Sequence, residues 1–364
     1  MYNVAVNDHG NDNGKPARAA TIADVAARAG VSRQTVSRAI NGLGEISAET
    51  RQRVLAVVQE LGYRPSSIAR GLKTSRTRTI GLVVPDIANP FFAEVARGAA
   101  EVAHGEGYGV LLCNTDENPA EERNVLEMLA EHRVDGLVLC SSRLGDTDLE
   151  AVMARHRPLV VVNRTPARTL AGVGSVSVAD REDARRAVHY LYGLGHRAMA
   201  FVGGTDASQS SRGRREGYAL ALTELGCPTV PEWVVSAPPT VEGGRQAAET
   251  LLGRHQVTAL LAFNDLVAVG CIRACEAVGL AVPRDVSVLG WDDILFAPYL
   301  SPPLTTVRLP KHEMGARAMG LLLALVRNPE LVPAPLELAG ELVIRRSTGP
   351  GPATQDASYK MEER

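Results

Sequence analysis

The stretch TIADVAARAGVSRQTVSRAIN, residues 21–41, decides the first part of the fold. Thr21 followed three positions later by Asp24 is a capping-box start for a helix, which Gly30 then ends. Ser32 can cap a second helix after a tight turn. The apolar residues of this second helix recur at the spacing of one buried face and are Val36, Ala39 and Ile40. Two short helices joined through such a turn predict a helix-turn-helix.

The opposite face of the second predicted helix carries side chains suited to DNA. Arg33, Gln34, Ser37 and Arg38 fall together on its exposed face, because positions i, i+1, i+4 and i+5 of a helix cluster. Arginine matches the acceptor edge of guanine and glutamine matches adenine, while the helix N-terminus and nearby hydroxyls suit phosphate. The alternative is an ordinary solvated helix face.

Charge is distributed unevenly along the chain, whose net charge is -2. Residues 15–78 carry 12 lysines and arginines against four acids, a net charge of +8, and the chain after residue 78 carries -8. A basic N-terminal module on an acidic body indicates an anionic partner for that module alone. A third predicted helix over 47–62 completes the module, and residues 66–73 form a further short helical segment before a polar link to residue 78.

From residue 79 onward, apolar strand-like runs alternate with helical patterns. The strand-like runs are 79–85, 108–114, 134–141, 158–163, 197–204, 258–264 and 285–291. The helical patterns between them include 92–104, 119–132, 180–194, 214–225, 241–252 and 266–278. Apolar strands separated by helices predict parallel sheets buried on both faces, and this many elements suit two doubly wound lobes. The glycine pair Gly172 and Gly174 indicates a turn.

Several ordered motifs resemble those of the LacI/GalR family of bacterial transcription regulators. The matching segments are TIADVAARAGVSRQTVSRAIN, SAETRQRV, LGYRPSSIARGL, RTIGLVVPDIANPFFAEVARG, LGHR, GYALAL, FNDLVAVG, VPRDVSVLGWDD and SPPLTTVRLP. The match runs from about residue 20 to 349. The resemblance implies an α/β fold with a three-helix DNA-binding headpiece, a hinge helix and two lobes of periplasmic-binding-protein type. It also implies a homodimeric repressor that binds palindromic double-stranded operator DNA.

These expectations divide the chain into five parts. They are a disordered tail (1–19), the headpiece (20–65), the hinge helix and linker (66–78), the two-lobed core (79–349) and a second disordered tail (350–364). Within the core, the first lobe is expected over about 79–179 and 310–328, and the second over about 180–309 and 329–349.

The resemblance assigns DNA contacts position by position. The residues matching major-groove reading positions are Arg33, Gln34 and Arg38, and those matching supporting or phosphate contacts are Thr21, Ser32, Thr35, Ser37 and Asn41. The hinge helix is expected to fold only when packed, because a helix of two turns is marginal in water. In the minor groove Leu72 would be the apolar wedge, Ile68 would pack on its symmetry mate, and Ala69 and Arg70 would line the groove. The alternative is a plain basic linker.

Ligands of doubly wound lobes bind beyond the carboxyl ends of the strands, where this chain places two phenylalanines, amides and carboxylates. The residues that match effector positions of the family are Phe91, Phe92, Asn163, Ser208, Ser210, Arg214, Asn264 and Asp292. Phe91 and Phe92 are equally compatible with core packing. Asn264 and Asp292 favour a polyol, hence a sugar or sugar derivative, and a purine or nucleoside is the alternative. Lys311 could meet an anionic sugar.

Other chemistry is not expected. The chain holds no Gly-x-Ser-x-Gly elbow, His-Glu-x-x-His or phosphate-binding loop, so we expect neither an enzyme nor a cofactor. Five scattered cysteines predict neither disulfides nor a metal site. No apolar run approaches the roughly 18 residues that cross a bilayer, and no signal pattern opens the chain, so we expect a cytoplasmic protein without a membrane partner. The remaining alternative is a solute-binding protein with similar lobes, and the missing signal pattern argues against it.

Overall fold

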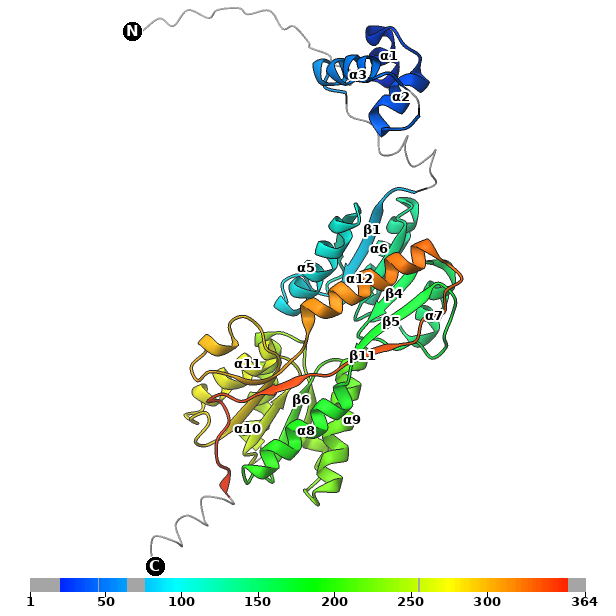
Figure 1. Cartoon of the computed structure of the whole chain (residues 1–364). Helices are drawn as coiled ribbons and strands as arrows, with labels where there is room; N and C mark the ends of the chain where they lie inside the picture. Colours follow the sequence, from blue (N-terminus) through cyan, green and yellow to red (C-terminus); the bar gives the residue numbers. More distant parts are fainter. Residues whose placement is uncertain (1–19, 45, 64–75, 255, 353–364) are drawn as a thin grey trace, which may run out of the picture. The chain divides into compact units, whose positions relative to one another are not determined.

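The computed structural model describes residues 20–44, 46–63, 76–254 and 256–352, in two units that meet between Thr77 and Arg78 (Figure 1). Each unit is described by itself. The expected hinge helix over 66–73 lies outside the described residues, as do the first expected tail and all but residues 350–352 of the second. In the described part, no helix combines the length and the apolarity needed to cross a bilayer.

The small unit consists of three helices around one apolar cluster. They are α1 (Ile22–Ala29), α2 (Arg33–Asn41) and α3 (Ala48–Glu60). Thr21 and Asp24 form a reciprocal capping box on α1, and Gly30 ends that helix with a φ of 66°, a left-handed conformation that glycine adopts without strain. Val25, Val36 and Val54 are fully buried, one from each helix, so the three helices share a core.

The large unit contains two six-stranded sheets, each the centre of one lobe. The first sheet has the order β11 (Leu336–Leu338), β5 (Val173–Val178), β4 (Leu159–Val162), β3 (Gly136–Cys140), β1 (Thr79–Val84) and β2 (Gly109–Asn114). The second has the order β12 (Glu341–Val343), β10 (Thr305–Arg308), β9 (Ser287–Asp292), β8 (Ala259–Ala262), β6 (Met199–Gly203) and β7 (Val234–Ser236). All pairings are parallel except that of β10 with β12.

Helices flank both sheets (Figure 1). Those of the first lobe are α5 (Pro90–Gly105), α6 (Pro119–Glu131), α7 (Asp146–Arg155) and α12 (Lys311–Arg327). Those of the second lobe are α8 (Asp180–Gly193), α9 (Gln209–Glu224), α10 (Val241–Arg254) and α11 (Asp265–Ala277). Single turns lie at η1 (Pro231–Trp233) and η2 (Ala297–Tyr299). Helix α9 begins earlier than the pattern over 214–225 indicated, which places Arg214 inside the helix rather than at its start.

The chain passes between the lobes three times, and the third passage corrects the expected lobe boundary. Leu336 pairs with Val176 in the first sheet, whereas Thr306 pairs with Val343 in the second. The segment 329–349 therefore does not lie wholly in the second lobe. It contributes one edge strand to each lobe, because an extended segment can continue either sheet by backbone hydrogen bonds alone.

The structure confirms the expected turn at Gly172 but not at Gly174. Gly172 has a φ of 74° and does form a turn, but Gly174 is a buried residue of β5. A Cβ at Gly174 would lie 2.5 Å from Cδ2 of Leu321 on α12. The prediction of a turn at Gly174 was wrong because this glycine makes room for a helix that is distant in the sequence.

Candidate functional site

Helix α2 turns its polar side away from the core of the small unit. Val36 and Ala39 are buried, while Arg33, Gln34 and Arg38 are exposed. The helix begins at the Ser32 cap, whose Oγ accepts a hydrogen bond from the Thr35 backbone N–H at 3.1 Å. The three side chains predicted to read the major groove therefore share an accessible helix face.

The residues predicted to support DNA contacts have local partners in the structure. The Thr21 hydroxyl donates to Asp24 at 2.7 Å, and the Asn41 amide donates to the Ser37 carbonyl at 2.7 Å. These bonds fix the two ends of the helix-turn-helix. Phosphate contacts stay predictions for all five of these residues, which are Thr21, Ser32, Thr35, Ser37 and Asn41. The hinge residues Ile68, Ala69, Arg70 and Leu72 lie outside the described residues.

In the large unit, one cavity between the lobes brings together all eight residues expected in the effector cleft. The lining residues are Asn89, Phe91, Phe92, Glu117, Ser141, Arg143, Asn163, Ser208, Ser210, Arg214, Pro239, Phe263, Asn264 and Asp292. The cavity measures about 30 Å³. Sites for small molecules usually measure about 300–1,000 Å³, so the cleft is narrow in this structure.

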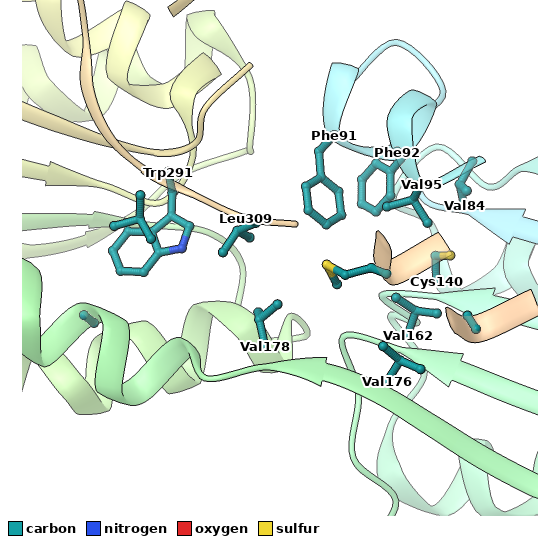
Figure 2. Packing of buried hydrophobic residues seen from close by; sticks show 14 of the residues in the cluster. Val84, Phe91, Phe92, Val95, Cys140, Val162, Val176, Val178, Trp291 and Leu309 are labelled. Atoms are coloured by element: carbon teal, nitrogen blue, oxygen red, sulfur yellow. The ribbon is translucent and has the colours of Figure 1, made fainter. Parts of the chain in front are cut away.

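Phe91 and Phe92 serve both of the roles that the sequence left open. Their rings meet edge to face with centroids 5.0 Å apart, and both residues are buried in the large apolar cluster of this unit. Figure 2 shows them beside Val95, with Trp291 and Leu309 across from them. Both also line the cavity, so the pair packs in the core and forms an apolar wall of the cleft.

Arg214 is held rigidly on the second-lobe side of the cavity. Its side chain is 3% exposed, and its Nε donates to Asp180 Oδ1 at 2.7 Å. Nη1 donates to the carbonyl oxygen of Phe263. The guanidinium carbon also lies 4.7 Å from the ring centroid of Trp291 and 4.9 Å from that of Phe263. These contacts place the remaining N–H groups of a charge-compensated arginine at the cavity.

Asp292 ends β9 with its carboxylate at the cavity. The residue is 4% exposed and has a φ of 107°, a strained value for a residue with a side chain. Burial raises the pKa of Asp292 to about 7, although Arg214 and Lys311 act in the opposite direction. Lys311 does not line the cavity, and its ammonium group donates to the backbone carbonyls of Asp292 and Asp293. The suggestion that Lys311 meets an anionic sugar is therefore not supported.

The other expected cleft residues combine capping with exposure to the cavity. Ser208 caps α9 and Asn264 caps α11, where Asn264 Oδ1 accepts from the Val267 N–H at 2.8 Å. The amide of Asn163 donates to Ser141 Oγ at 3.1 Å, whereas Asn163 Oδ1 is buried without a hydrogen-bond partner. A buried carbonyl oxygen of this kind calls for a donor. Asn163 is therefore a candidate to accept a hydrogen bond from a ligand.

Sequence reasoning missed an ionic contact on the first-lobe side. Arg143 is 6% exposed, and its Nη2 donates to Glu117 Oε1 at 2.9 Å. Glu117 and Ser141 follow β2 and β3, so the rule about strand ends could have found them. They share a second feature with Asn163 and Asp292, because all four cavity residues have positive φ values. Such backbone strain is concentrated at functional sites.

Comparisons with known proteins agree with this architecture. Residues 21–66 match the profile described as bacterial regulatory proteins of the lacI family, and residues 188–348 match that of a periplasmic binding protein-like domain. The transcriptional repressor PurR of Photobacterium profundum is 37% identical over 331 residues, which cover 90% of this chain and 98% of the relative.

Two solved structures are similar over most of the chain. A lac repressor dimer bound to operator and an anti-inducer is 28% identical with a TM-score of 0.83, covering 91% of this chain and all of that one. A complex of the transcriptional regulator CelR with cellobiose is 32% identical with a TM-score of 0.69, covering 90% and 99%. These relatives are transcriptional regulators, not enzymes. The chain belongs to the LacI family of bacterial transcriptional regulators.

Proposed function

We propose that this protein is a repressor that binds a palindromic operator as a homodimer and changes its operator affinity when a small ligand enters the cleft. The exposed polar face of α2, in one chain with a polar cleft between two lobes, is the observation that carries the proposal. The similar lac repressor structure is a dimer bound to operator. The predicted hinge contacts of Ile68, Ala69, Arg70 and Leu72 with the minor groove are part of this proposal.

The chemistry of the cavity favours a sugar or sugar derivative. Both arginines that line it are paired with carboxylates, so the wall offers compensated N–H donors rather than net positive charge. The buried carbonyl of Asn163 and the carboxylate of Asp292 remain as acceptors for hydroxyl groups. Ring hydroxyls supply donors and acceptors together, and the apolar wall of Phe91 and Phe92 suits the face of a sugar ring. A similar regulator forms a complex with cellobiose.

A purine or nucleoside is the second candidate. The edge-to-face pair of Phe91 and Phe92 could also contact a planar base, and the relative that is 37% identical is named PurR. Asp292 could accept from a ring N–H of such a ligand.

The two candidates are separated by measuring operator binding with a ligand panel. The operator is first selected from random duplexes with the full-length protein at moderate salt. Fluorescence anisotropy is then measured with glucose, cellobiose, hypoxanthine and guanine. We expect one of the sugars to change the operator affinity by about 5–150-fold, the usual range of allosteric coupling.

Asp292→Asn tests the role of the cleft in this experiment, since it keeps the size of the side chain and removes its charge. We expect it to weaken the ligand response without changing operator binding by the free protein. A response only to the purines would replace the sugar proposal. Equal affinity for the selected duplex and for random DNA under every condition would contradict the repressor proposal.

A further inference from the structure

An ion pair of the first lobe, to which the family resemblance assigns no role, forms part of the cleft wall. Nη2 of Arg143 donates to Oε1 of Glu117 at 2.9 Å, and Nε of Arg143 donates to the other oxygen of the same carboxylate. This two-point contact matches the fork of the guanidinium to both carboxylate oxygens. Both residues line the cleft cavity, so whatever enters the cleft meets the pair.

Further hydrogen bonds hold both partners of this ion pair in place. Glu117 lies between β2 and α6 with a φ of 58°, and its backbone N–H donates to the Pro85 carbonyl at 2.9 Å. Arg143 follows β3, where its backbone N–H donates to the buried Glu122 at 2.8 Å and its Nη1 to the Ser141 carbonyl at 2.6 Å. The guanidinium of Arg143 therefore has little freedom to leave Glu117 for a ligand.

The positive charges of the cavity wall are matched by negative ones. The charged side chains that line the cavity are two arginines and two acids, namely Arg143, Arg214, Glu117 and Asp292. Arg214 is in turn paired with Asp180. Among the described residues, no arginine or lysine without a carboxylate partner lines the cavity. Recognition of a phosphate group usually relies on such an available cation.

An anionic ligand meets two unfavourable arrangements at this pair. If it displaces Glu117 from Arg143, the carboxylate loses two hydrogen bonds and stays close to the anion. If it binds beside the pair, two negative charges lie close together with little water to screen them, because the side chains of Glu117 and Arg143 are only 23% and 5% exposed. Either arrangement costs free energy that an uncharged ligand of the same shape avoids. A hydroxyl group can instead donate to Glu117 without disturbing the pair.

We propose that Glu117, by occupying Arg143, restricts the cleft to uncharged ligands and excludes their phosphorylated forms. This charge selection rests on the proposed function, because it takes the cleft as the effector site, and it applies to a sugar and to a nucleoside alike. Removal of the Glu117 charge leaves Arg143 as a buried cation without its partner. Such a cation attracts an anion, so the cleft of a variant without this charge should accept a phosphate group.

Three full-length variants test the charge selection. Glu117→Gln removes the charge of the carboxylate and keeps the size of the side chain. A double variant with Glu117→Gln and Arg143→Gln removes the cation as well. Asp148→Asn is the matched control, because Asp148 forms an ion pair with Arg123 across 25 positions of the same lobe, but both of these side chains are about half exposed.

The first measurement uses inorganic phosphate as the probe and needs no effector. The fluorescence of Trp233 and Trp291, both in the large unit, follows thermal unfolding in phosphate and in chloride of equal ionic strength. We expect phosphate to raise the melting temperature of Glu117→Gln more than that of the wild type, because an anion that binds only the folded state stabilises it. The double variant and Asp148→Asn should respond like the wild type.

Two outcomes of this measurement would overturn the proposal. One is a phosphate response of Glu117→Gln equal to that of the wild type. The other concerns a Glu117→Gln variant that is unfolded in chloride: phosphate should then restore its native circular dichroism, and a failure to do so would show that the pair does not select against anions.

The second measurement compares probes that differ only by a phosphate group in isothermal titration calorimetry. The pairs are glucose with glucose 6-phosphate and inosine with inosine 5′-phosphate. For the pair that binds, we expect the wild type to prefer the uncharged member by about tenfold or more, the usual contribution of one charge-assisted hydrogen bond. Glu117→Gln should reduce or reverse this preference, and Asp148→Asn should keep it.

A wild type that binds the phosphorylated member as tightly as the uncharged one would contradict the charge selection. If none of the four probes binds any variant, the proposed ligand classes fail, while the measurement with inorganic phosphate still decides the role of Glu117.

Discussion

At the scale of single residues, both arginines that line the cleft form ion pairs. Arg143 contacts Glu117 in the first lobe, and Arg214 contacts Asp180 in the second. An uncompensated charge in such a buried position would cost several kcal/mol. The pairs therefore allow two buried arginines to line the cavity. Asp292, without an ion pair at its carboxylate in the described structure, instead has its pKa raised by burial to about 7.

The role of Arg33 in reading DNA is a prediction at this scale. Replacing Arg33 with Ala should cost about 1–3 kcal/mol on the preferred operator and relax the sequence preference at one position. Arg33 is exposed at the start of α2, so its loss should leave the core of the small unit intact. Anisotropy titrations on operators with single base changes measure the effect.

Arg53→Ala is the control for this prediction, because Arg53 is exposed on α3 rather than on α2. It should either leave binding unchanged or weaken all sequences alike, as the loss of a phosphate contact does. An Arg33→Ala variant that weakened every duplex by the same factor would show that Arg33 contacts the DNA backbone and not a base.

At the scale of elements, glycines allow helices to pack closely. A Cβ at Gly315 of α12 would lie 1.9 Å from the carbonyl oxygen of Val95 on α5. A Cβ at Gly98 of α5 would likewise lie 2.1 Å from the carbonyl oxygen of His312. These contacts involve backbone atoms, which cannot rotate away as a side chain can. The crossing of α5 and α12 therefore depends on both glycines.

Gly315→Ala should lower the free energy of unfolding by about 1–3 kcal/mol, the usual effect of overpacking. Gly320→Ala on the same helix is the matched control, because no atom lies within 4 Å of a Cβ built there. It should be neutral or stabilise by up to about 1 kcal/mol, because alanine favours helices. Urea denaturation of the full-length variants measures both, and equal stabilities would contradict the close crossing.

At the scale of the whole molecule, the buried Asp265 of the second lobe makes the stability of the protein depend on pH. Asp265 is fully buried and accepts hydrogen bonds from Thr306 Oγ1 at 2.6 Å and from the Ile294 N–H at 2.8 Å. Burial, followed by the charge of Asp292, raises the pKa of Asp265 to about 8 from its ordinary value of 3.8. Between these values the folded state retains a proton that the unfolded state has released, so stability falls as pH rises through this range.

Asp265→Asn should make this pH dependence shallower between about pH 4 and 8, because the amide does not titrate. The comparison with the wild type isolates Asp265 from His196, whose pKa is lowered by burial and which acts in the opposite direction. Urea unfolding at a series of pH values gives both slopes. Parallel slopes would show that Asp265 is ionised in the folded protein throughout this range.

What could be derived from the chain alone follows from short-range chemistry. Caps, helical spacing and the turn at Gly30 define the helix-turn-helix. Strand ends indicated Phe91, Phe92, Arg214, Asn264 and Asp292 as cleft residues, the family resemblance added Asn163, Ser208 and Ser210, and all eight line one cavity. Each of these patterns involves only a few neighbouring residues, and the family motifs are local in the same way.

The remaining features depend on residues that are far apart in sequence and meet only on folding. Glu117 pairs with Arg143 across 26 positions, Thr165 bonds to Gln209 across 44, and Gly174 is covered by Leu321. The division of β11 and β12 between the two sheets belongs to the same class. No local sequence pattern predicts such contacts, because their free energy comes from burial and from hydrogen bonds between elements that the lobes bring together.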